Sequence, residues 1–210
     1  MFRKYKLEVN YCAPSRYIET TKSERLNILK IKHTKVDEEF YIIIQDLLET
    51  KLVQDLSQFT QHGFQSRLEH CVSVSYSSFK LGKALGLDYI AMARGGLLHD
   101  LFFYDWRTTK FEEGSHAYVH PRIALNNAKT ITTLTSIEED IILNHMMGST
   151  LDIPKTREGF LVSMVDKYLA TSEGLRGLFF KLSKTKTPYS HLANLVYHKE
   201  LFSIVYGTRF

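Results

Sequence analysis

Gly95-Gly96-Leu97-Leu98-His99-Asp100 is the stretch that decides how the rest of the chain is interpreted. It has the character of the end of a buried helix, because two small residues permit close packing and two leucines suit a core. His99 and Asp100, both good ligands for a divalent metal, then stand side by side. A carboxylate directly after an apolar run is costly to bury unless it is paired or bound to a metal. The stretch therefore predicts partners for Asp100 elsewhere in the chain.

Apolar residues on both sides of this stretch recur at intervals of three and four, which is typical of amphipathic helices. Gly86 has the usual place of a glycine just after a helix, and Pro121 suits the first turn of one. The segment Ser136-Ile137-Glu138-Glu139 is a capping box, which marks a helix start. The predicted helices cover about residues 36–52, 65–85, 87–98, 120–129, 136–147, 155–172, 175–183 and 188–205.

The fold class predicted from these segments is all-α. Residues 101–115 are irregular and rich in aromatic and polar groups. Residues 7–11 could form a short strand and residues 22–32 a helix. We expect residues 1–60 to be an N-terminal extension packed on the core, and residues 61–210 to form the helical core with C-terminal helices.

Composition narrows the range of functions. The net charge of +4 is mild, and without a dense Lys/Arg stripe it does not indicate specific nucleic-acid binding. Cys12 and Cys71 have no paired spacing, which favours reduced thiols. No apolar run approaches the roughly eighteen residues of a membrane span, and the N-terminus lacks a signal-peptide core. We therefore expect a cytoplasmic protein that does not enter membranes; a homodimer is an open alternative.

Candidate metal ligands fall one per predicted helix or helix end, so an antiparallel bundle could bring them to one point. Taken singly, each histidine could instead be a surface residue or a helix cap. Asp166 is flanked by Val165 and Leu169, so its face is buried and its carboxylate needs a cation. The set consists of His70, His99, Asp100, His120, His145 and Asp166.

This ordered set resembles the HD-domain superfamily of metal-dependent phosphohydrolases. His70, the doublet His99-Asp100 and Asp166 carry the resemblance. The two histidines between the doublet and Asp166 match the longer H…HD…H…H…D pattern of binuclear members, similar to bacterial dinucleoside tetraphosphate hydrolases. The resemblance covers about residues 62–173 and implies an HD-domain helical bundle.

By that resemblance, His70, His99, Asp100 and Asp166 would hold one metal. Asp100 would bridge to a second metal held by His120 and His145. Mixed imidazole and carboxylate ligands suit transition metals better than magnesium alone. We expect two divalent ions, iron or manganese first, with zinc or nickel as alternatives.

A phosphorylated substrate needs further cations beside the metals. Arg67 lies one turn before His70, and Lys167 directly follows Asp166, so both are candidates for catalysis and substrate binding. Each could equally be a surface charge. Asp105 and Trp106 follow the doublet in a loop expected to rim the pocket, where substrate contacts are common.

The leading hypothesis is an enzyme that cleaves a nucleotide or related phosphoester or phosphoanhydride with a metal-activated hydroxide. Cyclic-dinucleotide phosphodiesterases of the superfamily carry a GYP signature that is absent from this sequence. Two alternatives stay open. The same ligands would serve a di-iron oxygenase of the HD fold, and the domain could be a non-catalytic, nucleotide-binding regulatory module.

Overall fold

The computed structural model describes residues 35–61 and 65–183. Within these residues the fold is all-α, as predicted, and it contains no strand. The predicted helix over 188–205, the short strand over 7–11 and the helix over 22–32 lie outside the described residues. The elements are α2 (Lys35–Leu48), α3 (Lys51–Asp55), the 3-10 helix η1 (Leu56–Gln58), α4 (Arg67–Leu85), α5 (Tyr89–Leu98), α6 (His116–Ile131), α7 (Ser136–Asn144) and α8 (Arg157–Ser183).

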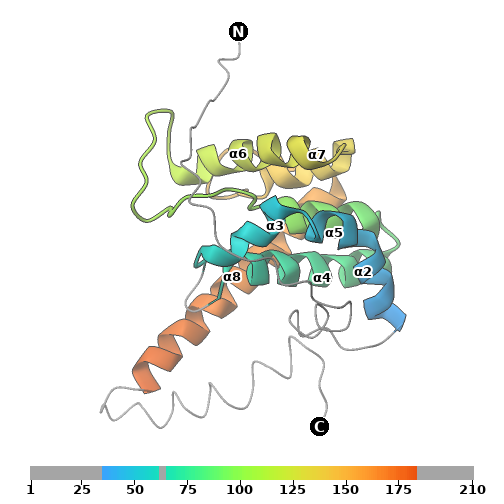
Figure 1. The fold of residues 1–210 in the computed structure, drawn as a ribbon, viewed down its shortest axis with the longest axis horizontal. Helices are drawn as coiled ribbons and strands as arrows, with labels where there is room; N and C mark the ends of the chain where they lie inside the picture. Colours follow the sequence, from blue (N-terminus) through green and yellow to red (C-terminus); the bar gives the residue numbers. More distant parts are fainter. Residues whose placement is uncertain (1–34, 62–64, 184–210) are drawn as a thin grey trace. The chain divides into compact units, whose positions relative to one another are not determined.

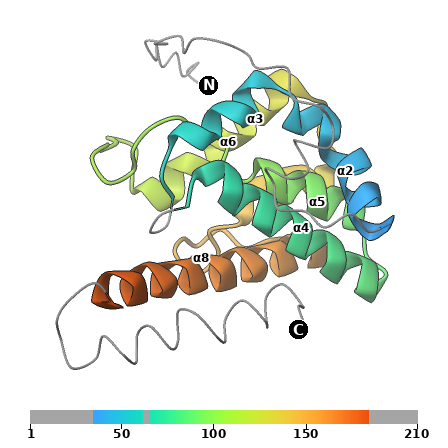
Figure 2. The ribbon, with the colours of Figure 1, turned by 60° about the horizontal axis from the view of Figure 1, so that its bottom comes forward.

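Helices α4 and α5 lie side by side at the centre of the described fold (Figure 1). Helix α8 packs against both α4 and α7, and its contact with α4 is seen most clearly in Figure 2. Helix α6 packs on α7, and α2 packs on α5. The green loop between α5 and α6 extends away from the helices in both views. The division at residue 60 stays a prediction.

One apolar cluster joins the four central helices. Val74 of α4, Met92 of α5, Ile141 of α7, and Val162 and Leu169 of α8 are buried together. Burying such side chains stabilises a fold by roughly 1.5–3 kcal/mol each. This cluster holds together the helices that contain or directly precede five of the six candidate ligands, all except His120 of α6.

One predicted helix start and the predicted capping residue of another helix were wrong, whereas α7 begins at Ser136 as predicted. Helix α6 begins at His116, a turn before His120, and therefore contains Pro121 in its interior. Stacking of the His116 ring on His120, with ring centroids 4.3 Å apart, favours this extra turn over the local proline signal. The capping box of α7 is formed by Thr135 and Glu138, one residue earlier than predicted. Glu138 is buried there and also accepts a hydrogen bond from Arg94.

The prediction of separate helices over 155–172 and 175–183 was also wrong, because α8 is one continuous helix. Gly174 does not end it. Buried Ser172 and Glu173 directly before this glycine tie the segment to the interior. Tertiary packing here outweighs the weak helix propensity of glycine.

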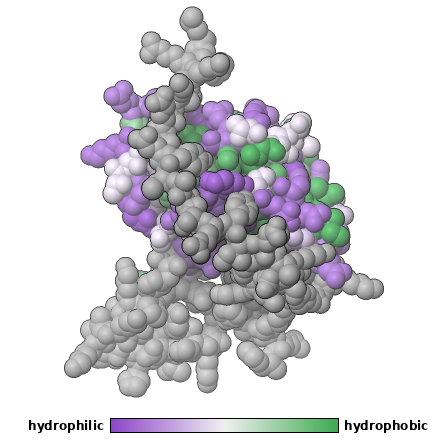
Figure 3. Space-filling view, in the orientation of Figure 1, coloured by the Kyte–Doolittle hydropathy of each residue, from purple (hydrophilic) through white to green (hydrophobic). Residues whose placement is uncertain are grey.

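The described surface visible in Figure 3 is mainly hydrophilic, with apolar residues in small groups between polar ones. Among the described helices, none combines the length and apolar character needed to cross a membrane.

Close contact between α4 and α5 depends on Gly96. A Cβ atom there would lie 3.1 Å from the Cα of Ser75 and 3.3 Å from its backbone nitrogen. Because backbone atoms cannot yield as a side chain can, we expect Gly96→Ala to lower the free energy of unfolding by about 1–2 kcal/mol. Gly174 is helical and has no neighbour within 4 Å of such a Cβ. Gly174→Ala should therefore raise stability by about 0.5–1 kcal/mol. Urea denaturation measures the free energy of unfolding of both variants. Equal changes in this free energy for Gly96→Ala and Gly174→Ala would contradict the packing argument.

Candidate metal centre

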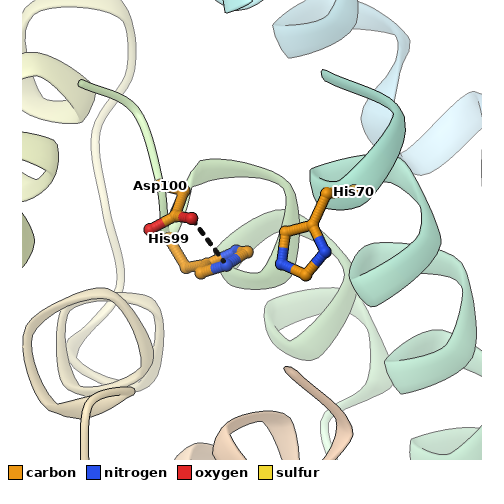
Figure 4. Close-up of side chains that lie close together, drawn as sticks. All are labelled: His70, His99 and Asp100. Atoms are coloured by element: carbon orange, nitrogen blue, oxygen red, sulfur yellow. Dashed lines mark ion pairs between the residues drawn. The ribbon is translucent and has the colours of Figure 1, made fainter. Parts of the chain in front are cut away.

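All six predicted ligands are buried in the described structure. They come from α4, α6, α8 and the C-terminal ends of α5 and α7. Figure 4 shows His70, from α4, close to His99 and Asp100 at the end of α5. Two groups place their ligand atoms within 4.8 Å of one another: His70 with His99 and Asp100, and Asp100 with His120 and His145. Asp100 belongs to both.

Backbone carbonyls orient three of the four histidines. The Nδ1 atom of His99 donates to the carbonyl of Gly96 at 2.7 Å, and that of His145 donates to Ile142 at 2.8 Å. Both carbonyls belong to the last turn of a helix, where the intrahelical partners run out. The Nδ1 atom of His120 donates to the His116 carbonyl at 2.9 Å. With the proton on Nδ1, each Nε2 atom presents a lone pair.

These lone pairs converge in the second group. The Nε2 atoms of His120 and His145 are 2.8 Å apart, and they lie 3.1 Å and 3.5 Å from Oδ1 of Asp100. Two neutral rings with protonated Nδ1 atoms would point lone pairs at each other across this distance. Such an arrangement needs a cation between or on the rings, either a proton or a metal ion.

In the first group, Asp166 faces two imidazoles. Its Oδ1 atom lies 3.0 Å from Nε2 of His70 and 3.6 Å from Nε2 of His99. The buried Nε2 of His99 has no hydrogen-bond partner, because the nearby oxygens of Asp100 and Asp166 are too distant. A buried ring nitrogen without a hydrogen-bond partner is costly unless something else binds it. A metal ion between these side chains fits that requirement.

Both carboxylates are held in the anionic form. Burial alone would raise the pKa of Asp100, but the charge of His99 and hydrogen bonds with His120 and His145 hold it well below its usual value. The pKa of Asp166 is likewise lowered, because contacts with His70 and His99 outweigh burial. Buried anions facing imidazole nitrogens form a donor set suited to divalent transition metals.

Glu173 is a member of the site that sequence reasoning missed. Its Oε2 atom accepts from Nδ1 of His70 at 2.9 Å. Although burial opposes it, the hydrogen bonds of Asp166 and Glu173 raise the pKa of His70 to about 10. Glu173 follows Asp166 by two helical turns, so both lie on one face of α8. The predicted helix ends at residue 172, so the two-turn spacing between Asp166 and Glu173 was not recognised as one helix face.

Arg67, a candidate for catalysis and substrate binding, contacts other protein groups, and its role toward a substrate stays a prediction. Its side chain is fully buried at the start of α4, and its three nitrogens donate to Gln61, Phe102 and Tyr104. Gln61 in turn donates to Asp100. Sequence reasoning missed Gln61, which has no local pattern to mark it.

Lys167 contacts the backbone of His145, one of the predicted metal ligands. Its Nζ atom donates to the His145 carbonyl at 2.9 Å and to Oγ of Ser163 at 2.7 Å. Ser163 itself donates to the same carbonyl at 2.6 Å. Lys167 thus holds the end of α7, and its role toward a substrate stays a prediction.

The two loop candidates contact their own surroundings. Asp105 is exposed and accepts from the backbone nitrogen of Arg107 at 3.0 Å. The ring of Trp106 stacks on His116, with centroids 5.7 Å apart, and the Arg107 guanidinium lies 4.8 Å from its centre. His116 stacks in turn on His120. The loop therefore contacts the second group through a column of rings, and substrate binding by Asp105 and Trp106 stays a prediction.

Comparisons with known proteins give one distant relative. No family model matches the chain, and no solved structure matches it. The chain is similar to Ribonuclease Y of Mesoplasma florum, with 29% identity over 151 residues. The match includes 71% of this chain but only 27% of that protein's length. The chain thus combines distant similarity to a ribonuclease with His/Asp groups that could bind metal ions.

The contact between Glu173 and His70 predicts a defined effect on metal binding. Removing a carboxylate that orients a metal-binding histidine typically costs about 10–100-fold in affinity. We expect a loss of that size for Glu173→Ala and a smaller one for Glu173→Gln, which keeps an acceptor oxygen. Titration of the metal-free protein with Mn²⁺ measures the affinity.

The neighbouring Ser172 provides a matched control. It is also buried in α8, but its hydroxyl donates to the carbonyl of Leu169. Ser172→Ala should leave Mn²⁺ affinity unchanged. Unchanged affinity in Glu173→Ala would show that the carboxylate does not support the ligand.

Proposed function

We propose that this chain is a metal-dependent phosphohydrolase of the HD type, acting on a nucleotide or related phosphoester. The observation that carries the proposal is the convergence of four buried imidazoles, through their Nε2 atoms, on Asp100 and Asp166. The residues occur in the H…HD…H…H…D order noted in the sequence. The similarity to a ribonuclease supports phosphoester chemistry, because a ribonuclease by its name cleaves such bonds.

In this proposal His70, His99 and Asp166 hold one divalent metal, His120 and His145 hold a second, and Asp100 contacts both. Iron or manganese fits these ligands, with zinc or nickel as alternatives. When bound, such a pair supplies an acidified water as nucleophile and positive charge for the phosphoryl oxygens.

The chain's own residues then have two tasks. Carbonyls at the ends of α5 and α7 keep His99 and His145 in the tautomer that leaves Nε2 free. Glu173 orients the ring of His70 by accepting from its Nδ1 atom. The site is therefore oriented before a substrate arrives, which lowers the cost of reorganisation during the reaction.

Asp100 is the most informative position for testing the reaction. Asp100→Ala removes the ligand shared by both groups, and we expect it to lower metal-dependent hydrolysis by roughly 10³-fold or more. The assay uses protein loaded with Mn²⁺ or Fe²⁺ and a panel of a dinucleoside tetraphosphate, a cyclic dinucleotide, a short RNA and bis(p-nitrophenyl) phosphate. Helical circular dichroism should stay largely intact.

Asp100→Asn keeps the shape of the side chain and should show the same loss. Near-normal hydrolysis in either variant would refute the assignment of Asp100. If the loaded wild-type protein cleaved no phosphoester but consumed O₂, the chemistry would be that of an oxygenase instead.

His145 tests whether the centre is binuclear. Because its Nε2 atom faces only the second group, His145→Ala should lower the bound metal from two ions per chain to about one. Elemental analysis of the dialysed protein measures the ratio.

His116 offers a matched control, because it stacks on His120 but is not one of the proposed ligands. His116→Phe keeps a ring at this position and should retain both ions. An unchanged metal content in His145→Ala would disprove the second metal.

A further inference from the structure

The carboxylate of Asp100 is divided between two environments. Its Oδ1 atom faces His120 and His145, at 3.1 Å and 3.5 Å from their Nε2 atoms. Its Oδ2 atom lies 3.6 Å from Nε2 of His99 and accepts from the amide of Gln61 at 2.5 Å. A carboxylate that contacts two metals must be held in one rotation, and Gln61 is the side chain that holds its Oδ2 edge.

The orientation of the Gln61 amide follows from its two partners. Arg67 can only donate, and its Nε atom lies 2.8 Å from Oε1 of Gln61. An ionised Asp100 can only accept. One amide orientation satisfies both, with the oxygen toward Arg67 and the NH₂ group toward Asp100. Arg67 therefore determines which group Gln61 presents to the carboxylate.

Arg67 is itself fixed from several sides. Nη1 donates to the Phe102 carbonyl at 2.6 Å, and Nη2 donates to the Tyr104 carbonyl at 3.3 Å. The guanidinium also lies 3.5 Å from the centre of the Phe102 ring, a cation–π distance. With no exposed surface, it is not available to an incoming phosphate.

The backbone of Gln61 is anchored as well. Its nitrogen donates to the Gln65 carbonyl at 2.9 Å, and its carbonyl accepts from Nη2 of Arg107 at 2.9 Å. Gln61 is buried and therefore has little freedom to move away from Asp100. These contacts connect the loop after Asp100 to the segment before α4.

We propose that Gln61 and Arg67 are positioning residues that fix the rotation of Asp100 for two metals, and that Arg67 does not bind the substrate. The proposal rests on the proposed metal centre. It assigns to Arg67 a role that acts through Gln61. Changes at Gln61 or Arg67 should act through Asp100 and weaken both proposed metal sites. A change at His145 should weaken only the second site.

Gln61→Met tests the proposal, since methionine has similar length but no amide. We expect Mn²⁺ affinity to fall by about 10–100-fold at both sites, and kcat to fall more than KM. Electron paramagnetic resonance should show less of the spin-coupled Mn²⁺ pair at equal total metal. Gln54→Met is the matched control, because that amide donates to the Leu48 carbonyl, and it should leave all three readouts unchanged.

Arg67→Met should act in the same direction as Gln61→Met. The double variant should bind Mn²⁺ no more weakly than the weaker-binding of the two single variants, because Gln61 and Arg67 belong to one chain of hydrogen bonds. If Arg67→Met does not fold, Arg67→Lys and Gln61→Met decide the question. A raised KM with unchanged Mn²⁺ affinity in the Arg67 variants would overturn the proposal in favour of a substrate contact.

Unchanged affinity and spin coupling in Gln61→Met would overturn it as well. Metal titration and spin coupling need no turnover. A wild-type protein that binds two coupled Mn²⁺ ions but hydrolyses nothing would therefore refute the proposed reaction, while the same two readouts would still decide the role of Gln61 and Arg67.

Discussion

The burial of two carboxylates among four imidazoles is the constraint on which the described structure depends. Asp100 and Asp166 are anionic and buried, so they need positive charge close by. The Nε2 atoms of His120 and His145 lie 2.8 Å apart beside one of them. Each of these groups alone would destabilise the interior. A shared cation would offset both costs at once, and the His/Asp groups could hold a metal ion in that place.

Several residues next to the candidate ligands hydrogen-bond to them. Glu173 supports His70, Gln61 and Arg67 support Asp100, and Lys167 holds the carbonyl of His145. These contacts connect α8 to α4 and to the end of α7. Arg67 also connects the start of α4 to the loop after α5. Two charged side chains that the sequence suggested for substrate binding thus have structural partners. Their charge still contributes to the field at the site, because electrostatic effects extend beyond direct contacts.

Helix positions were the most predictable part of the fold. Gly86 adopts the left-handed conformation of a helix end, with φ of 66°, and α4 and α5 match their apolar patterns closely. The errors share one cause. The start of α6 and the continuity of α8 depend on contacts with residues distant in sequence: His116 packs against the ring of Phe102, and Glu173 accepts from His70. Local signals from Pro121 and Gly174 were opposed by those contacts, and no local pattern could reveal that.

By itself the sequence determined the all-α class and the order of the candidate ligands, because helical periodicity and residue chemistry are local properties. It also implied that His99 and Asp100 end a buried helix. Only the tertiary structure decided that Glu173 orients His70, that Asp100 belongs to two groups, and that Arg67 faces inward. These features depend on groups brought together from separate helices, whereas the carbonyls that orient His99, His120 and His145 lie three or four residues before them. Hydrogen bonding between distant segments leaves no periodic trace in the chain, so the geometry of the site had to come from the fold.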